Sequence, residues 1–517
     1  MSTAVSETAY IYDRAARRAN LWRRGLLAIC LMALFVLALA LYLHTLALPF
    51  DRDSYDEGVY WQTLRAMGAG YHLYSPTFYS QPPAFLLSIY PIYTIFGQTL
   101  WSARLGIVVI ALLGLVGAFL LGRTLRSTLV GLIGLVLLML SPLYLTAGQT
   151  IQAEGPQVAF SMLAVAFAYL WWERPTGWQG LCYAALCTLT LMLSIFSKLF
   201  GFATLVPIGL LALAQCWRVI QQTRDNQQPR GQARCFTVLD SLLLGSAVFL
   251  TATLLILSPF ATAWPSFWSE VVTFHTAAKT ISSTIGNLQQ IRTFWQHNIL
   301  MYTALYGTLV ALWRRDWRVL PLLAWLFTLV YLLWQQAPLF AHHFVILVPA
   351  LVSLSLMGFG PFPSRLRDIS RITAATSLVC LLLVLFTLFS DVRGVQAHYR
   401  DMQVQADSGS TQASLRVADD LEKMTRPGQF VITDAQFITG LSQRNTPPEL
   451  VDTSYVRINT SFVTTRQVIQ IAGQPRVQAI LFYTGRLQKL TGLHDWVSQH
   501  FRRVHMYGNG QELWIKM

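Results

Sequence analysis

Charged side chains are scarce in this chain of 517 residues. They make up 12% of the sequence, whereas hydrophobic residues make up 54%. Soluble domains carry roughly 25% charged residues, so this composition excludes an ordinary water-soluble protein. Together with the mean hydropathy of +0.46, it predicts a chain that crosses a membrane many times.

Cysteine is also scarce, and its placement excludes two classes of site. The six cysteines all lie in or beside apolar runs, and none follows Cys380. A disulfide framework is therefore not indicated, and no Cys/His spacing typical of a metal site appears. The glycines of the C-terminal part, after residue 390, form no phosphate-binding fingerprint either, so we predict no nucleotide site there. No internal repeat stands out.

Apolar runs long enough to span a bilayer are frequent. We expect eleven transmembrane helices, at 25–48, 105–122, 128–147, 156–172, 178–197, 199–217, 236–258, 296–313, 318–335, 343–360 and 372–390. A twelfth apolar run, Ala84–Phe96, is short and contains Pro91. We expect it to be re-entrant or to lie in the membrane interface.

The distribution of basic residues supports this arrangement. With residues 1–24 as a cytoplasmic tail, the inside loops carry eighteen basic residues and the outside loops of the membrane part carry six. If Ala84–Phe96 crossed the membrane, every later basic cluster would move outside, against the positive-inside rule. The same rule explains the net charge of +14 without a nucleic-acid partner. No cleavable signal peptide is expected, because the first apolar run is too long for one.

An odd number of spans places residues 391–517 outside. This part alternates helical and strand patterns: helices at 411–424, 464–472 and 490–501, strands at 429–433 and 477–483, and a hairpin around Gly508-Asn-Gly510. The predicted fold class is a polytopic α-helical membrane protein with a small C-terminal α/β extracytoplasmic domain. The predicted domains are a cytoplasmic tail (1–24), a membrane domain (25–390) and this α/β domain (391–517).

Acidic residues cluster in one place. Eleven lie between Arg24 and Asp391, and four of these lie in the segment 51–57, directly after the first apolar run. Ionised groups at the edge of a membrane are costly and usually functional. The alternative is structural: Ser54-x-x-Glu57 is a capping box for a helix that ends near Met67. A cap needs one acid, however, and this loop has four, followed by several aromatic residues.

The order of short motifs here resembles a known family. The motifs are Asp56-Glu57-Gly-x-Tyr, Gly70-x-x-x-Tyr74, Gln81-Pro-Pro, Phe96-Gly97 and Arg104-Leu105. They are similar to the first extracytoplasmic loop of the dolichyl-phosphate-mannose–protein mannosyltransferases and their bacterial relatives, which include the lipid A aminoarabinose transferases. The aminoarabinose-type enzymes usually have lysine before the Pro-Pro pair, where this chain has Gln81.

The resemblance implies a reaction and a first pair of site residues. It implies a C-type glycosyltransferase that moves a sugar from a polyprenyl-phosphate donor to an acceptor hydroxyl on a protein, lipid or glycan. Such a reaction needs a base for the hydroxyl proton, and the family's loop acids correspond to Asp56 and Glu57. We expect Asp56 to be the base, and Glu57 either to place the acceptor or to be the second candidate for the base.

The departing phosphate needs cations nearby. Lys198, between the fifth and sixth predicted spans, is one candidate, and an anchor at a helix end is the alternative. The resemblance also points to His342 and His343, for which a merely structural role is the alternative. Glu154 could contact the acceptor or a metal, or cap the helix that contains Pro156. No cofactor is certain, and a divalent cation is the candidate. Lys279 and Arg292 carry only a weak signal.

Two other functions fit the same composition. A transporter or flippase predicts charges at the bilayer midplane and often two matching halves, whereas here the charges lie near one surface. A non-enzymatic envelope assembly protein requires the loop acids to be caps only. We expect a multi-pass protein of the plasma membrane whose site and C-terminal domain face outward.

Overall fold

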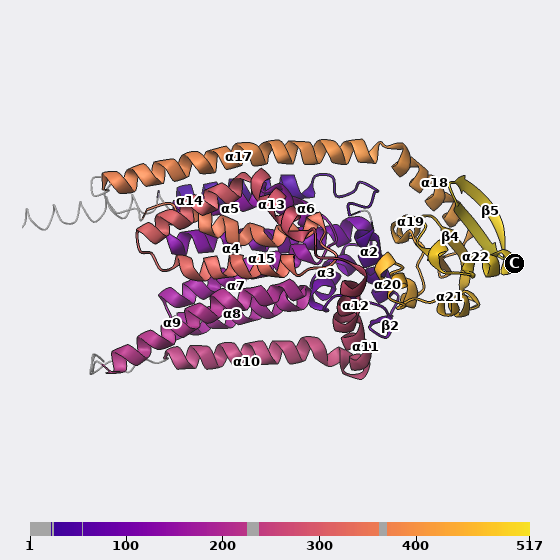
Figure 1. The fold of residues 1–517 in the computed structure, drawn as a ribbon, viewed down its shortest axis with the longest axis horizontal. Coiled ribbons are helices and arrows are strands. Elements are labelled where there is room, and N and C mark those ends of the chain that lie inside the picture. Colours follow the sequence, from indigo (N-terminus) through magenta and orange to yellow (C-terminus); the bar gives the residue numbers. More distant parts are fainter. Residues whose placement is uncertain (1–21, 23–24, 54, 225–236, 361–369) are drawn as a thin grey trace, which may run out of the picture. The chain divides into compact units, whose positions relative to one another are not determined.

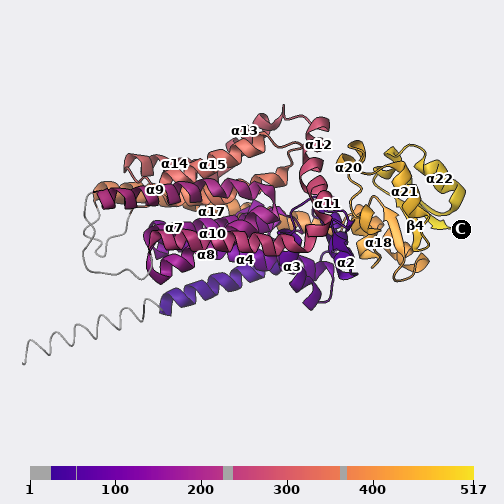
Figure 2. The ribbon, with the colours of Figure 1, turned by 90° about the horizontal axis from the view of Figure 1, so that it is seen from below.

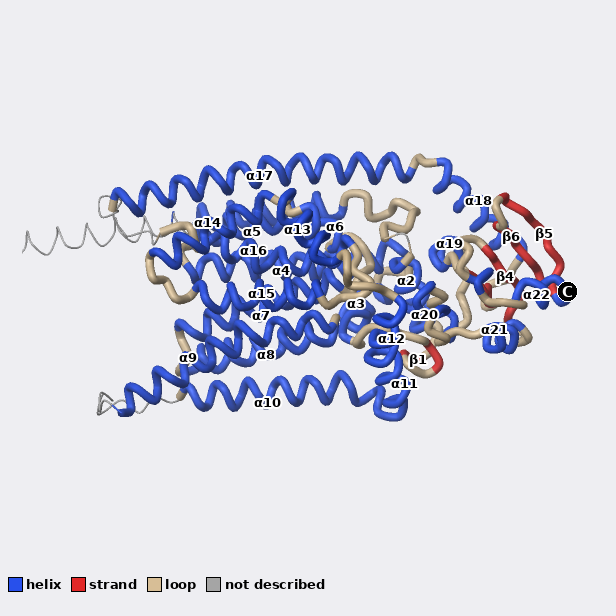
Figure 3. Tube along the Cα trace, viewed as in Figure 1, coloured by secondary structure: helices blue, strands red, loops and turns tan. Residues whose placement is uncertain are grey.

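The computed structural model describes residues 22, 25–53, 55–224, 237–360 and 370–517. It is mainly helical, and strands occur at His72–Leu73 (β1), at Pro76–Thr77 (β2) and near the C-terminus (Figures 1 and 3). The chain divides into two compact units, 1–44 and 45–517. In the first unit, Gly25–Leu43 forms one apolar helix.

The second unit contains the other ten runs that are predicted to span the membrane, and each of them is helical. The helices are α4 (Leu100–Leu125), α5 (Thr128–Leu140), α6 (Pro142–Ala147), α7 (Glu154–Glu173), α8 (Gly177–Ser197), α9 (Leu205–Arg224), α10 (Val238–Leu257), α14 (Ile299–Trp313), α15 (Val319–Trp334), α16 (Val348–Leu356) and α17 (Arg371–Ala406). Among the described residues of the whole chain, six helices are long and apolar enough to cross a membrane. The multi-pass prediction is therefore supported, while the count of eleven remains a prediction.

Small residues allow the central helices to approach closely. A Cβ atom on Gly117 of α4 would lie 3.0 Å from the backbone nitrogen of Leu163 in α7, and one on Gly114 would lie 3.0 Å from the Cβ of Ala159. Helices inside a membrane pack through such small residues, because lipid provides no hydrophobic force to bring them together.

The segment expected to be a loop at 259–295 is largely helical. It contains a 3₁₀ helix, η2 (Ser258–Ala263), and a short π-helix, η3 (Ser269–Thr273). Its α-helices are α11 (Trp264–Trp268), α12 (Phe274–Ile281) and α13 (Asn287–His297). Figure 2 shows α11 and α12 near the end of the bundle where α2 and α3 lie.

The C-terminal part contains the predicted α/β elements. Four strands form one sheet in the order β3-β4-β6-β5. The elements of the C-terminal part are α18 (Gly409–Met424), β3 (Phe430–Thr433), α19 (Gln436–Leu441), α20 (Tyr455–Asn459), α21 (Thr465–Ala472), β4 (Val477–Phe482), α22 (Leu493–His500), β5 (Phe501–Gly508) and β6 (Gln511–Lys516). The β5–β6 hairpin turns at Gly508, Asn509 and Gly510, all with positive φ. The predicted boundary at residue 391 falls inside α17, which continues without a break to Ala406.

The first loop packs against this C-terminal part. It contains α2 (Asp56–Gly68) and α3 (Ala84–Ile95), and α2 lies beside α19 (Figure 1). The buried Gln62 side chain donates to the carbonyls of Gln436 and Arg444 and accepts from the backbone N–H of Thr446. Because every polar atom of the amide is used across the contact, the two parts are held in one orientation.

A buried ion pair fixes the start of α2. The side chains of Glu57 and Arg104 are both fully buried, and the guanidinium grips the carboxylate with two bonds of 2.8 and 2.7 Å. Arg104 also donates to the carbonyls of Leu46, Leu48 and Phe50. All the side-chain N–H groups of Arg104 thus bind either Glu57 in α2 or the segment that precedes α2.

We expect Arg104→Met to destabilise the protein strongly. It leaves the Glu57 carboxylate buried without its partner, which typically costs about 3–5 kcal/mol, and it also leaves three carbonyl oxygens without a donor. A large fall in the thermal unfolding midpoint of the purified protein would show this. Lys423→Met is the matched control, because it breaks an exposed ion pair with Asp419, and it should leave the midpoint unchanged. Equal unfolding midpoints for the two variants would contradict the stabilising role of the Glu57–Arg104 pair.

Candidate active site

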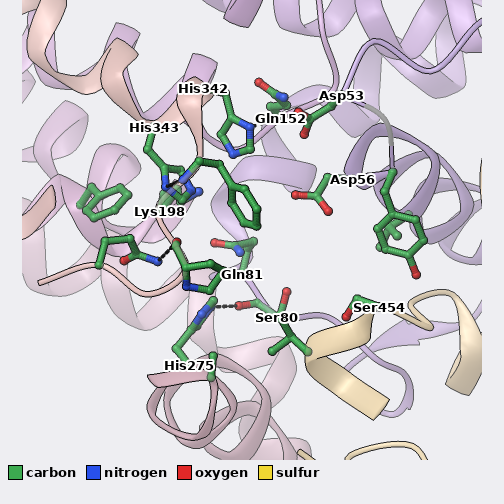
Figure 4. A pocket seen from close by; sticks show the side chains of 18 of the residues that line it. Asp53, Asp56, Ser80, Gln81, Gln152, Lys198, His275, His342, His343 and Ser454 are labelled. Atoms are coloured by element: carbon green, nitrogen blue, oxygen red, sulfur yellow. Dashed lines mark hydrogen bonds and ion pairs between the residues drawn. The ribbon is translucent and has the colours of Figure 1, made fainter. Parts of the chain in front are cut away.

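A cavity of about 900 Å³ lies where the first loop, the ends of the membrane helices and the C-terminal part meet. Its polar lining includes residues between Arg52 and Tyr60, the turn at Ser80 and Gln81, and the helix ends at Lys198, His342 and His343. The helix α12 adds His275 and Lys279, and the C-terminal part adds Asp452, Ser454, Tyr455 and Arg486. Figure 4 shows Asp53, Asp56, Lys198 and both histidines around the same space.

Asp56 lines this cavity as the first residue of α2. Its side chain is half-buried, and its carboxylate accepts no hydrogen bond from the described residues. Figure 4 shows it beside the cavity. Burial and the neighbouring negative charge of Asp53 raise the pKa of Asp56 to about 7. A carboxylate that changes its charge near neutral pH is suited to accept and release a proton.

Lys198 and the two histidines converge on Glu154. Lys198 donates to Oε1 of Glu154, and the Nε2 atoms of His342 and His343 lie 3.4 and 3.5 Å from the same oxygen. Nδ1 of His343 accepts from the backbone N–H of Phe340 at 3.2 Å, so its proton is on Nε2, facing Glu154. The structure thus brings four of the predicted residues together.

His342 connects this cluster to the acidic loop. Its Nδ1 lies 3.0 Å from Oδ1 of Asp53, while Nε2 faces Glu154. An imidazole between two carboxylates is favoured in its charged form. Lys198 and a charged His342 would together supply positive charge beside Asp56.

The side chains present also fit a divalent cation. Two groups have one ligand atom from each residue within 4.8 Å of the others: Asp53, Asp56 and His342, and Glu154, His342 and His343. Oδ2 of Asp53 is buried and makes no hydrogen bond to any residue that the structure describes. Carboxylate and imidazole ligands suit Zn²⁺ or Mn²⁺, so the first group, with its unsatisfied oxygen, has the better donor set.

Glu57 requires a correction. It does not line the cavity; its Oε2 accepts from the backbone N–H of Arg52 at 2.9 Å and its Oε1 from that of Ile151 at 3.2 Å, in addition to Arg104. Glu57 therefore holds the loop, and both oxygens of its carboxylate are used in these buried contacts. Ser54, the other half of the predicted capping box, lies outside the described residues, and Tyr55 at the N-cap makes no side-chain cap bond.

Other residues differ from expectation in smaller ways. Gln81, at the position where relatives have lysine, is buried and lines the cavity. Lys279 also lines the cavity, whereas the exposed Arg292 does not. No sequence pattern indicates Asp53 as the partner of His342, and none indicates Ser454 or Arg486, which belong to the C-terminal part.

Comparison with known proteins supports the resemblance. Residues 80–224 match the family described as dolichyl-phosphate-mannose-protein mannosyltransferase. No protein with a curated description matches the chain. Among solved structures, ArnT from Cupriavidus metallidurans bound to undecaprenyl phosphate has a TM-score of 0.64 at 14% identity, with 94% of this chain and 97% of ArnT covered. The apo state of the same protein gives 0.63.

A more distant similarity extends to a larger enzyme. Archaeal oligosaccharyltransferase AglB from Archaeoglobus fulgidus, solved with an inhibitory peptide and a dolichol-phosphate, has a TM-score of 0.50 at 13% identity and covers 94% of this chain and 74% of its own. The resemblance predicted from the sequence is thus confirmed: residues 80–224 match the mannosyltransferase family, and the chain has the fold of ArnT and AglB.

Proposed function

We propose that the chain is a membrane glycosyltransferase that moves a sugar from a polyprenyl-phosphate donor to an acceptor hydroxyl on the extracytoplasmic face. The observation that carries this proposal is Asp56: an acid with a pKa of about 7, free of hydrogen bonds from the described residues, in a cavity that also holds Lys198 and two histidines. The similar structures with bound undecaprenyl phosphate and dolichol-phosphate support the choice of donor.

The reaction assigns a role to each group. The Asp56 carboxylate accepts the proton of the acceptor hydroxyl, and the resulting oxygen attacks the anomeric carbon of the sugar. The bond between that carbon and the phosphate oxygen breaks, and the polyprenyl phosphate leaves with one more negative charge. Lys198 and a charged His342 stabilise that charge, and Glu154 holds both cations in place.

A divalent cation on Asp53, Asp56 and His342 would replace the proton of His342 as the source of positive charge at this place. Carboxylates and imidazole are deprotonated or neutral when they bind a metal, so such binding would compete with protons at Asp56. Glu57 acts through the position of Asp56, as a positioning residue. The acceptor is a hydroxyl of a protein, lipid or glycan.

Asp56→Asn is the first test of this reaction. Asn keeps the shape of the side chain but cannot accept the proton, and loss of a general base typically costs about 10² to 10⁴ in rate. We expect the variant to fold, to bind polyprenyl phosphate normally and to transfer almost no sugar, as measured by single-turnover assays with a labelled donor. Near-normal turnover would remove Asp56 from the reaction.

The pH dependence of the wild-type enzyme provides a second readout of the same residue. The carboxylate is active when it is deprotonated, so the transfer rate should rise with pH and level off above the pKa of about 7. The residual rate of Asp56→Asn should lack this rise. A wild-type transfer rate that stays constant from about pH 5, roughly two units below this pKa, to about pH 8 would contradict the assignment of Asp56 as the base.

Lys198 is tested by donor binding. Lys198→Ala removes a charge-assisted contact and should weaken polyprenyl-phosphate binding by about 1.5–3 kcal/mol, whereas Lys198→Arg should keep most of the affinity. Lys279→Ala is the matched control, because this exposed lysine lines the same cavity without contacting Glu154. An equal loss of polyprenyl-phosphate affinity in the two alanine variants would show that Lys198 makes no specific contact with the donor.

The orientation in the membrane is tested by labelling. In a cysteine-free background, single cysteines at Ser75 and Gly409 should react with an impermeant reagent added to intact cells, because both positions are proposed to face outward. A cysteine at Gln227, predicted to be cytoplasmic, should react only after permeabilisation. Protection of position 409 in intact cells would overturn the outward assignment.

A further inference from the structure

One wall of the cavity is formed by two loops of the C-terminal part. The first supplies Asp452 and Ser454 and leads into α20, which supplies Tyr455 and Val456, and the second supplies Arg486. The hydroxyl of Tyr455 donates to the carbonyl of Thr484 at 3.4 Å and so links the two loops. In Figure 4, Asp56 lies between Ser454 of this wall and Lys198.

The loop that carries Arg486 is rigidly held by one carboxylate. Asp434, at the end of β3, is fully buried. Its Oδ1 accepts from the backbone N–H groups of Tyr483 and Thr484 at 2.8 and 3.0 Å, and its Oδ2 accepts from those of Arg486 and Leu487 at 2.8 and 3.1 Å. Four backbone donors on one buried carboxylate fix the path of the loop.

The guanidinium of Arg486 is also fixed in position. It lies over the ring of Tyr55 at 3.9 Å and is 4.9 Å from the ring of Tyr455. The Tyr55 hydroxyl donates to Asp452 at 3.2 Å and accepts from the backbone N–H of Thr453 at 2.8 Å. The ring beneath Arg486 therefore cannot move freely, and it belongs to the residue directly before Asp56.

The side-chain donors of Arg486 have no acceptor within the described residues. Its Nε atom is buried and makes no hydrogen bond there, and its side chain forms no ion pair with a described carboxylate. The buried Arg444 shows the contrast: its Nη1 and Nη2 donate to the carbonyls of Ser442, Glu422 and Thr425. Buried donors without acceptors are costly, so a held, unsatisfied guanidinium in a cavity wall is suited to an anionic ligand.

We propose that Arg486 binds an anionic group of the acceptor, a phosphate or a carboxylate, and thereby turns the acceptor hydroxyl toward Asp56. This proposal rests on the proposed function and names its acceptor class. The donor phosphate has its own cations at Lys198 and His342, on helix ends of the membrane part. Arg486 comes from the C-terminal part instead, and its wall is polar, with Asp452 and Ser454 beside it.

The test compares three binding probes on the full chain in lipid nanodiscs: octyl glucoside, octyl glucuronide and octyl glucoside 6-phosphate. Fluorescence titration should show that the wild type binds at least one anionic probe about tenfold to hundredfold more tightly than the neutral one, the effect of one charge-assisted contact. The glucuronide and the phosphate distinguish a carboxylate acceptor from a phosphate acceptor. Equal binding of all three probes would overturn the proposal.

Arg486→Gln should abolish this preference, and Arg486→Lys should keep part of it. Lys489→Gln is the matched control, because Lys489 also lies over the Tyr455 ring, at 4.1 Å, but does not line the cavity. The control should keep the full preference. A preference that survives in Arg486→Gln would overturn the proposal.

Binding of undecaprenyl phosphate separates this proposal from the proposed function. It should be unchanged in Arg486→Gln, which also shows that the variant is folded. If Arg486→Gln lost the lipid as well as the anionic probes while its unfolding midpoint stayed normal, Arg486 would belong to the donor site and the acceptor assignment would be wrong. If the wild type bound no undecaprenyl phosphate, the proposed function would fail, while the probe comparison would still decide the role of Arg486.

Discussion

The buried pair of Glu57 and Arg104 is the interaction on which the geometry of the site depends. Arg104 connects α4 to the carbonyls of the segment before α2, and Glu57 adds the backbone N–H groups of Arg52 and Ile151. Two fully buried charges are tolerated only when every donor and lone pair is used, and here the partners come from three separate parts of the chain. These contacts therefore fix the position of the first turn of α2. Successive residues of a helix point about 100° apart, so anchoring Glu57 in the interior turns Asp56 toward the cavity.

Two adjacent carboxylates thus acquire opposite properties. Burial alone would raise both pKa values. At Glu57 the charges of Arg104 and Arg52 outweigh burial, and the pKa lies below its usual range. At Asp56 the charge of Asp53 adds to burial, and the pKa rises to about 7. Separating the pKa values of neighbouring acids is a common way in which enzymes divide structural and proton-transfer roles.

The sequence predicted what depends on local pattern and missed what depends on distant contacts. The helices of the membrane part and the strands of the C-terminal part followed from hydrophobic runs, periodicity and the Gly508-Asn-Gly510 turn. The resemblance assigns both Asp56 and Glu57 to the substrate, because a local motif does not show that Arg104, 47 residues away, binds Glu57. The boundary at 391 was set by a fall in hydropathy, but hydropathy reports the surrounding solvent, and the hydrogen bonds of α17 continue past it. No local pattern marks Arg486 as a site residue, because the residues that hold it, Tyr55 and Asp434, are distant in the sequence.

The contact between the first loop and the C-terminal part also restricts the topology. Gln62 bonds to the backbone near Arg444, and Tyr55 bonds to Asp452 and Thr453. Groups in direct contact at the end of the bundle lie on the same side of a membrane, so the chain between them crosses an even number of times. The ten spans predicted after the first satisfy this condition. A crossing by Ala84–Phe96 would make the number odd, unless a second segment also changed its assignment. The same contact explains why the C-terminal part can supply a wall of the cavity, since the loop that carries Asp56 and the loops that carry Ser454 and Arg486 are then held on one face.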